Sequence, residues 1–221
     1  MNLVTYPDRE MMMIDVANMM AGELRAALAS NGTATLAVPG GSTPGPVFDN
    51  LCDVDLDWEN VTVMLGDERC VPESSERSNT RLIRERLLTG KAAAAKFVSF
   101  AIDPAVQLEA LQQEVEAHLP LNLLLLGMGA DMHTASLFPG APELEAALAP
   151  DAPAVVTMTP QDGLEPRVTL SGRALKSAMS IHVLITGAEK RAALETAAKL
   201  HDAKDAPIRT VLGDATIHWA E

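Results

Sequence analysis

Residues 121–140, LNLLLLGMGADMHTASLFPG, contain the stretch that decides the fold of this chain. The apolar run Leu123–Leu126 ends at a glycine and has the length and composition of a buried parallel strand. Two polar side chains, Asp131 and His133, follow shortly after, and the pattern predicts a helix that begins near Thr134. Ligands of open α/β sheets lie beyond the carboxyl ends of the strands, so we expect the chemistry of this protein here.

The same alternation of apolar strand and amphipathic helix extends outward from this stretch in both directions. Towards the N-terminus, strands are expected at 33–38, 58–65 and 97–100, and helices at 8–30, 44–51, 78–88 and 104–119. Towards the C-terminus, strands are expected at 154–157, 168–170 and 179–186, helices at 171–176 and 187–200, and a small antiparallel addition at 209–212 and 216–219. No linker or repeat divides the chain, which predicts a single domain, 1–221, of the α/β class. It would be a doubly wound, mostly parallel sheet with helices on both faces, a Rossmann-like arrangement.

The composition excludes several classes of protein. Hydrophobic residues make up 48% of the 221, enough for a core, and the formal charge is −13, from 17 Lys plus Arg against 30 Asp plus Glu. This balance argues against nucleic acid and against an anionic membrane surface as partners. An anionic ligand would need a local positive potential, from backbone N–H groups, helix N-termini and a few basic side chains.

Location and partners follow from what the sequence does not contain. No apolar run approaches the roughly 20 residues that span a bilayer, and no signal peptide is visible at the N-terminus. Cys52 and Cys70 have no metal-ligand spacing and are expected as free thiols. We expect a cytoplasmic protein that acts on a small molecule, as a monomer or weak homo-oligomer.

A glycine-rich turn, Gly40-Gly41-Ser42-Thr43, follows one predicted strand and opens a helix. Successive backbone N–H groups in such a turn form an anion-binding concavity, and the helix dipole favours a phosphate there. The turn is neither a Walker loop nor a dinucleotide fingerprint. The alternative is a turn that only needs a positive φ, and the residues alone leave both interpretations open.

Three charged residues, Asp67, Glu68 and Arg69, come directly after the strand that ends near residue 65. Arg69 is suited to hold a phosphate or carboxylate in a bidentate fork. Asp67 or Glu68 would orient it or accept a hydrogen bond from a sugar hydroxyl. The alternative interpretation is a local ion pair.

His133 is the histidine best placed for proton transfer near pH 7, because the unperturbed imidazole pKa is about 6.5. The other histidines do not form a spaced cluster with it, so no metal is predicted. Lys190 lies one turn into a helix that begins at a glycine, and Arg167 precedes a strand. Both are candidates for a phosphate counter-charge, with a solvated side chain as the alternative. No Gly-x-Ser-x-Gly elbow is present, which argues against a serine hydrolase.

Four stretches of the chain together resemble a known family. They are AVPGGSTPGPVFDNL (37–51), VMLGDERCVPESSERSNTRLIRERLL (63–88), LLLLGMGADMHTASLFPG (123–140) and LSGRALKSAMSIHVLITGAEKRAAL (170–194). In this order and spacing they are similar to the signatures of the 6-phosphogluconolactonases, which share a fold with glucosamine-6-phosphate deaminase and isomerase. The resemblance implies hydrolysis of 6-phospho-D-glucono-1,5-lactone to 6-phosphogluconate, the second step of the oxidative pentose phosphate pathway. It also implies that no metal or organic cofactor takes part.

The resemblance also implies roles for particular residues. His133 would act as general base on water, and Asp67 and Arg69 would line the sugar site. The phosphate would be held by Gly41, Ser42, Thr43, Lys190 and Arg167. One position departs from the family pattern, because Met132 stands where a glycine usually precedes the histidine.

Two alternative functions were weighed. An amino-sugar phosphate deaminase-isomerase on the same fold usually has a Phe-Asn-Glu-Pro-like stretch after the histidine, whereas this chain has Thr-Ala-Ser-Leu-Phe-Pro. A non-catalytic sugar-phosphate sensor of a transcription regulator would need a DNA-binding segment. The acidic chain shows no basic helix-turn-helix.

Overall fold

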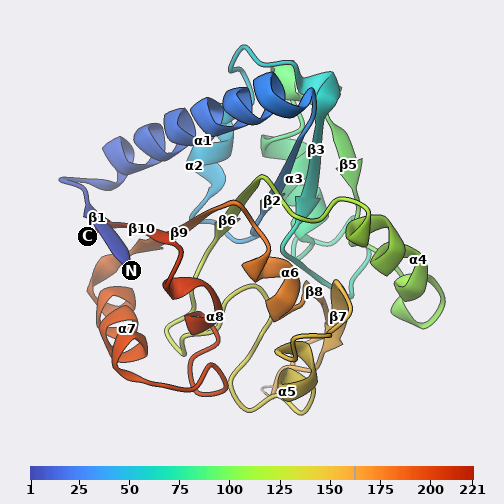
Figure 1. The fold of residues 1–221 in the computed structure, drawn as a ribbon, viewed down its shortest axis with the longest axis vertical. Coiled ribbons are helices and arrows are strands. Elements are labelled where there is room, and N and C mark those ends of the chain that lie inside the picture. The colour runs from blue at the N-terminus through green and yellow to red at the C-terminus, as the bar shows by residue number, and fades with distance from the viewer. Residues whose placement is uncertain (162) are drawn as a thin grey trace.

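The computed structural model describes residues 1–161 and 163–221, and its central element is a parallel sheet (Figure 1). Seven strands of the described chain form this sheet in the order β1-β10-β9-β6-β2-β3-β5. Their bounds in that order are Asn2–Thr5, Thr216–Ala220, Ser180–Thr186, Leu123–Leu126, Ala34–Val38, Val61–Leu65 and Lys96–Val98. Strand β6 lies in the middle with all four leucines buried, which is why its sequence is continuously apolar.

Helices cover both faces of this sheet. The long helix α1 (Arg9–Asn31) and α2 (Gly45–Leu51) lie on one side, and α7 (Gly187–Lys199) and α8 (Arg209–Leu212) lie on the other (Figure 1). The remaining helices are α3 (Asn79–Arg86), α4 (Pro104–Glu116), α5 (Leu144–Ala147) and α6 (Gly172–Lys176), with 3-10 turns at Trp58–Asn60 and Gly90–Ala94. The predicted doubly wound α/β fold is therefore confirmed.

A second, three-stranded antiparallel sheet stands beyond the end of β3. It consists of β4 (Asp67–Arg69), β8 (Arg167–Leu170) and β7 (Val155–Met158), in that order. The charged residues that follow β3 are thus a short strand themselves. Gly66 joins the two sheets, because its N–H donates to Val38 O of β2 (2.8 Å) and its oxygen accepts from Leu170 N of β8 (2.9 Å).

The helix expected to begin near Thr134 is absent from the described structure. The segment is a loop in which Thr134 bridges to Leu137 and the Thr134 hydroxyl donates to the oxygen of Gly127 (2.9 Å). Met132 and Ala135 have φ values of 68° and 48°, in the left-handed region, which a right-handed helix does not tolerate. The prediction was wrong because contacts to the residues that follow the preceding strand hold the loop in place. The spacing of apolar residues along the sequence does not reveal such contacts.

The expected antiparallel addition at the C-terminus was also wrong. Residues 209–212 form α8, and Thr216–Ala220 joins the main sheet in parallel between β9 and β1. The N-terminal strand β1 was not predicted, and its Asn2 aligns with Thr216. This pairing brings together the two ends of the chain, so a pattern within one short segment cannot predict it.

Candidate active site

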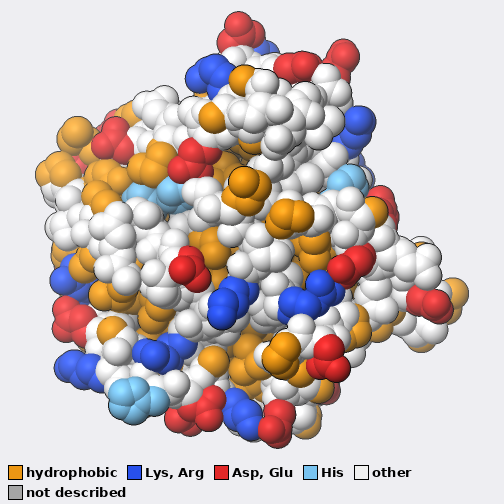
Figure 2. All heavy atoms as spheres, in the orientation of Figure 1, with side chains coloured by type: hydrophobic (Ala, Val, Ile, Leu, Met, Phe, Trp, Pro, Cys, Tyr) orange, Lys and Arg blue, Asp and Glu red, His pale blue; other side chains and the backbone are white. Residues whose placement is uncertain are grey.

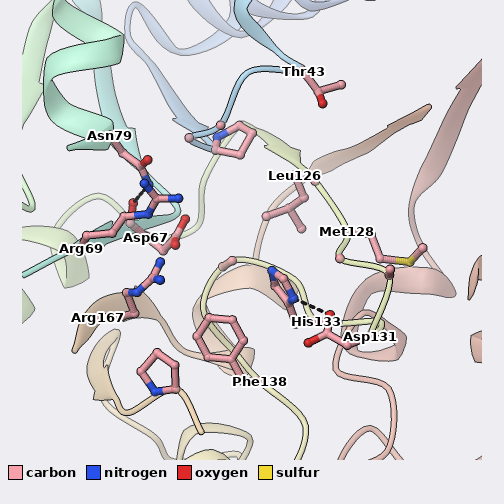
Figure 3. Close-up of a pocket in the computed structure, with 18 of the residues that line it drawn as sticks. Thr43, Asp67, Arg69, Asn79, Leu126, Met128, Asp131, His133, Phe138 and Arg167 are labelled. Carbon is pink, nitrogen blue, oxygen red and sulfur yellow. Dashed lines mark hydrogen bonds and ion pairs between the residues drawn. The ribbon is translucent and has the colours of Figure 1, made fainter. Parts of the chain in front are cut away.

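A cavity of about 850 Å³ lies at the carboxyl ends of β2, β3 and β6, where the sequence placed the chemistry (Figure 3). Ten of the candidate residues named from the sequence line it. They are Gly40, Gly41, Ser42, Thr43, Asp67, Arg69, Asp131, His133, Arg167 and Lys190. These residues come from five separate segments of the chain, which the parallel sheet and its antiparallel neighbour bring together.

His133 and Asp131 form a pair at one wall of this cavity. The imidazole Nδ1 lies 2.5 Å from Asp131 Oδ1, and the backbone N–H of His133 donates to the same oxygen at 3.2 Å. Burial opposes ionisation of Asp131, but the hydrogen bond and charge of His133 outweigh it, and the pKa of Asp131 is lowered. An ionised Asp131 accepts a hydrogen bond from the Nδ1–H group of His133. Nε2 is then the ring nitrogen turned away from Asp131 (Figure 3).

The backbone around this pair is tightly constrained. A Cβ atom on Gly129 would lie 2.2 Å from His133 Nδ1 and 2.3 Å from Asp131 Oδ1, so only glycine fits there. Met132, at φ 68°, occupies a conformation that glycine adopts at least cost. Its side chain packs against the hydrophobic core and its oxygen accepts from Ile208 N at 3.1 Å. These contacts let a methionine keep the turn that a glycine would make more easily.

Two arginines face the cavity from neighbouring strands. Arg69 on β4 and Arg167 on β8 are direct partners in the antiparallel register. Like charges placed opposite each other destabilise a strand pair unless something compensates them. Burial, and then the charge of Arg69, lowers the pKa of Arg167. Arg69 Nη1 donates to the oxygen of Arg77 (2.5 Å), while its buried Nε has no hydrogen-bond partner among the described residues. The arrangement is suited to an anion between the two guanidinium groups.

Asp67 lies between these arginines (Figure 3) and is almost fully buried. Burial raises its pKa, against the opposing effects of a hydrogen bond from Ser136 and the nearby charges of Arg69 and Arg167. Ser136 Oγ donates to Asp67 Oδ2 at 2.5 Å. The carboxyl group is therefore both held in place and partly compensated by the basic side chains around it.

Glu68, the alternative partner for Arg69 in the sequence, has a different position. Its carboxylate accepts from the backbone N–H groups of Asn79 (2.8 Å) and Thr80 (2.6 Å) and from the Ser78 hydroxyl (3.0 Å). It also accepts from the N–H of Arg69 at 2.7 Å. Glu68 thus satisfies the N-terminus of α3 and does not line the cavity.

The glycine turn and Lys190 also line the cavity. Gly41 has φ 88°, a backbone conformation that favours glycine, whereas a Cβ on Gly40 would lie 1.9 Å from the side-chain oxygen of Asn79. Lys190, in the first turn of α7, donates from Nζ to the oxygen of Met128. The turn needs a glycine at a positive φ and also lines the cavity, and phosphate binding there stays a prediction.

Three residues that contact the predicted site residues, Asn79, Phe138 and Ser136, were not singled out from the sequence. Asn79 Nδ2 donates to the oxygen of Asp67 (2.9 Å), and the ring of Phe138 lies 4.8 Å from that of His133, centroid to centroid. Phe138 also lies 5.7 Å from the Arg167 guanidinium. Ser136 is the third. Phe138 and Ser136 belong to the His133 loop, so their proximity in sequence was the available signal, whereas Asn79 had none.

Charge elsewhere on the molecule is mixed. On the face drawn in Figure 2, Lys and Arg side chains lie dispersed among Asp and Glu. Within residues 1–161 and 163–221, no group of three or more His, Cys, Asp and Glu side chains is placed to hold a metal ion. In the same described ranges no helix is long and apolar enough to cross a membrane. The concentration of positive charge at the cavity is local, as a strongly acidic chain requires for an anionic ligand.

Fold and cavity together define an α/β protein with a cavity, lined by basic side chains, at the carboxyl edge of its parallel sheet. Residues 7–219 match the family described as glucosamine-6-phosphate isomerases/6-phosphogluconolactonase, and the chain belongs to this family. It is 42% identical over 214 residues to a 6-phosphogluconolactonase of Rhizobium meliloti, covering 93% of this chain and 92% of that protein. It is 41% identical to one of Pseudomonas aeruginosa, over 90% of this chain and 87% of that protein.

Solved structures agree with the sequence matches. The crystal structure of a 6-phosphogluconolactonase from Shewanella baltica superposes with a TM-score of 0.94 at 31% identity, covering all of this chain and 97% of the other. The family expected from the four sequence stretches is therefore confirmed.

Proposed function

We propose that this protein hydrolyses 6-phospho-D-glucono-1,5-lactone to 6-phospho-D-gluconate, and so serves the oxidative pentose phosphate pathway. One observation carries the proposal: the His133–Asp131 pair, joined at 2.5 Å, faces the same 850 Å³ cavity as Arg69, Arg167 and Lys190. A proton acceptor therefore shares a cavity with three cations in an otherwise acidic chain. Relatives 37–42% identical bear the name 6-phosphogluconolactonase, which supports the same substrate.

We assign the phosphate to the wall formed by the glycine turn and α7. Gly41, Ser42 and Thr43 offer backbone N–H groups and hydroxyls, and Lys190 supplies a positive charge from the other side. Arg167, on β8, lies deeper in the cavity and is the additional phosphate ligand in this proposal. A substrate anchored at its phosphate would place its lactone carbonyl towards the His133 wall.

The proposed reaction needs no covalent intermediate, because a lactone is already an activated ester. His133 Nε2 accepts a proton from water while the water oxygen bonds to C1, and the carbonyl electrons move onto the carbonyl oxygen. Arg69 or backbone N–H groups stabilise that oxyanion. When the carbonyl re-forms, the bond between C1 and the ring oxygen breaks and His133 returns the proton to the ring oxygen. The acid product then ionises to the carboxylate.

Asp131 and Asp67 have supporting parts in this mechanism. Asp131 holds the imidazole with Nδ1–H towards itself and favours the imidazolium that forms as water attacks. Asp67, between Arg69 and Arg167, keeps the guanidinium groups oriented and is placed to accept a hydrogen bond from a sugar hydroxyl. Neither carboxylate is required to bond covalently to the substrate.

The test generates the lactone in situ from glucose 6-phosphate with its dehydrogenase and follows 6-phosphogluconate formation above spontaneous hydrolysis. We expect a clear acceleration by the wild-type protein. His133→Ala should lower kcat by about a hundred- to ten-thousand-fold, the usual worth of general-base catalysis. His201→Ala, which removes an exposed histidine outside the cavity lining, is the matched control and should keep wild-type kcat.

Two results would overturn this proposal. A wild-type protein that gives no rate above background would redirect attention to amino-sugar phosphates, beginning with a binding titration of glucosamine 6-phosphate. An active protein in which His133→Ala retains full kcat would keep the substrate but remove His133 from the mechanism.

A further inference from the structure

The loop that carries His133 is fastened to the β4–β8 pair through one buried residue, Ser136. Ser136 is fully buried, and its hydroxyl donates to Asp67 Oδ2 at 2.5 Å. Its backbone N–H donates to Thr169 Oγ1 at 3.2 Å. Thr169 is the residue opposite Asp67 in the antiparallel register. Ser136 therefore contacts both members of one cross-strand pair, three residues after His133.

Asp67 is held from two directions by these contacts. Asn79 Nδ2 donates to the backbone oxygen of Asp67 at 2.9 Å, and the Ser136 hydroxyl donates to the side-chain oxygen Oδ2 of Asp67. Asp67 lines the cavity, so Oδ1 is the oxygen left to face the substrate. The orientation of the carboxyl group thus depends on the Ser136 hydroxyl, while its backbone position depends on α3.

Without the Ser136 hydroxyl, the nearest strong partners for this carboxylate are the guanidinium groups of Arg69 and Arg167, whose charges already act on it. Rotation towards either arginine would form a direct ion pair and draw that arginine away from the substrate. Asp67 would then no longer present Oδ1 to the sugar. The hydroxyl contact prevents this because a short hydrogen bond to a carboxylate is stronger than a neutral one.

We propose that Ser136 is a positioning residue for the lactonase reaction, acting through Asp67 to keep Arg69 and Arg167 free for the substrate. This inference rests on the proposed function. Ser136 also connects two parts of the cavity, because it bonds the loop that bears the proton acceptor to the strands that bear the arginines.

A double-mutant cycle tests the inference with the lactone assay. Ser136→Ala should lower kcat about ten- to a hundredfold, since a misplacement of about 1 Å at a reacting centre can cost a hundredfold. KM should rise as well, because Arg167, one of the residues assigned to the phosphate, would be drawn towards Asp67. Asp67→Asn should also lower kcat, and the double variant should match Asp67→Asn within about twofold, since Ser136 has no carboxylate left to act through.

The control removes a comparable buried hydroxyl outside the cavity. Ser171 is fully buried and its side chain caps α6, accepting from Ala174 N at 3.3 Å. Ser171→Ala should lower the melting temperature without lowering kcat at 25 °C. Ser136→Cys keeps a side chain of similar shape but replaces the hydroxyl by a thiol, which is a weak donor. It should show the same loss of kcat as Ser136→Ala. The cysteine variant serves if the alanine variant does not fold.

The outcomes separate cleanly. Single-variant losses that multiply in the double variant would show that Ser136 acts independently of Asp67 and would overturn the inference. So would folded Ser136 variants with wild-type kcat. A wild-type protein with no lactonase activity would instead refute the proposed function itself, before any variant is compared.

Discussion

At the scale of single residues, the cavity depends on a close approach of the backbone beneath the His133–Asp131 pair. Gly129 N donates to the oxygen of His133 at 2.9 Å, and the imidazole and the Asp131 carboxylate lie directly over the Gly129 Cα. This contact is the physical reason for a glycine after the central strand. It is also distinct from the usual one, because no positive φ is involved at this glycine.

We predict that Gly129→Ala lowers kcat by at least about tenfold. A Cβ would lie 2.2 Å from His133 Nδ1, well inside van der Waals contact, so the imidazole and Asp131 must shift. The measurement is kcat in the lactone assay, together with a melting curve. The control is Gly213→Ala, where φ is −63° and an added Cβ meets nothing within 4 Å. Equal kcat for the two alanine variants would contradict this account of Gly129.

At the scale of elements, the short strand β4 serves two purposes with adjacent side chains. Asp67 and Arg69 line the cavity, whereas Glu68 between them turns to the opposite side and caps α3. Successive side chains of a strand point to opposite faces, which is why a three-residue strand can do both. The cap fixes α3, and with it Asn79, against the cavity.

We predict that Glu68→Gln lowers the free energy of unfolding by about 1.5–3 kcal/mol, the range for hydrogen bonds to charged groups. The amide would place an NH2 group among donors from Ser78, Asn79 and Thr80, and the charge that favours the helix N-terminus would be lost. Urea denaturation measures the difference.

Glu85→Gln is the control on the same helix. Glu85 is exposed and pairs with Arg81 four residues earlier, at 2.8 Å, so its loss should cost less than about 1 kcal/mol. If the two glutamine variants are equally stable, Glu68 is not the cap described here.

At the scale of the whole molecule, the two ends of the chain form one edge of the main sheet, as β1 and β10. A buried series of hydrogen-bonded polar side chains lies at this edge. Tyr6 Oη lies 2.9 Å from His218 Nδ1, and His218 Nε2 lies 2.9 Å from His182 Nδ1. His182 Nε2 in turn contacts Glu23 Oε2 of α1 at 3.1 Å and Ser180 Oγ at 3.2 Å. Each ring nitrogen therefore has a partner when both imidazoles are neutral and Glu23 is ionised.

We predict that acid destabilises the fold through this series of side chains. Burial, then the charge of His182, lowers the pKa of His218 to about 4, against the opposing charge of Glu23. The unfolded chain takes up this proton near pH 6.5, before the folded protein does, so stability falls as the pH drops from about 6.5 to about 4. The loss should reach about 3 kcal/mol at about 1.4 kcal/mol per pH unit. The pKa of Glu23 is also lowered, burial being outweighed by His182, which adds loss in the same direction below its unfolded value.

Urea denaturation at several pH values between 7 and 4.5 measures this dependence. His218→Gln should flatten the slope, whatever its stability at neutral pH, whereas His201→Gln, at an exposed site, should not. A wild-type stability that stays level across this range would show that the buried imidazoles take no part. Tyr6, whose pKa is raised by burial and then by Asp15, remains neutral throughout the range.

Local patterns were sufficient for most of the fold and for the membership of the cavity. The run that became β6 is continuously apolar, and those that became β2, β3 and β9 are mostly apolar, because both faces of a parallel sheet are covered; that property is visible in sequence. Parallel strands end at the same edge, so polar residues after each of them had to converge. That topological rule explains the residues that follow parallel strands, whereas Arg167 reaches the same cavity from the start of the antiparallel strand β8.

Contacts between distant segments were decided by tertiary structure alone. The β1–β10 pairing, the Arg69–Arg167 register, the Asn79 contact to Asp67 and the Ser136 contact to Asp67 join residues 12 to 214 positions apart. The helix predicted after Met132 is a loop because contacts with other parts of the structure fix its backbone conformation, and the sequence pattern does not show them. Periodicity reports which face of an element is buried, whereas the choice of partner across space depends on how all the elements pack together.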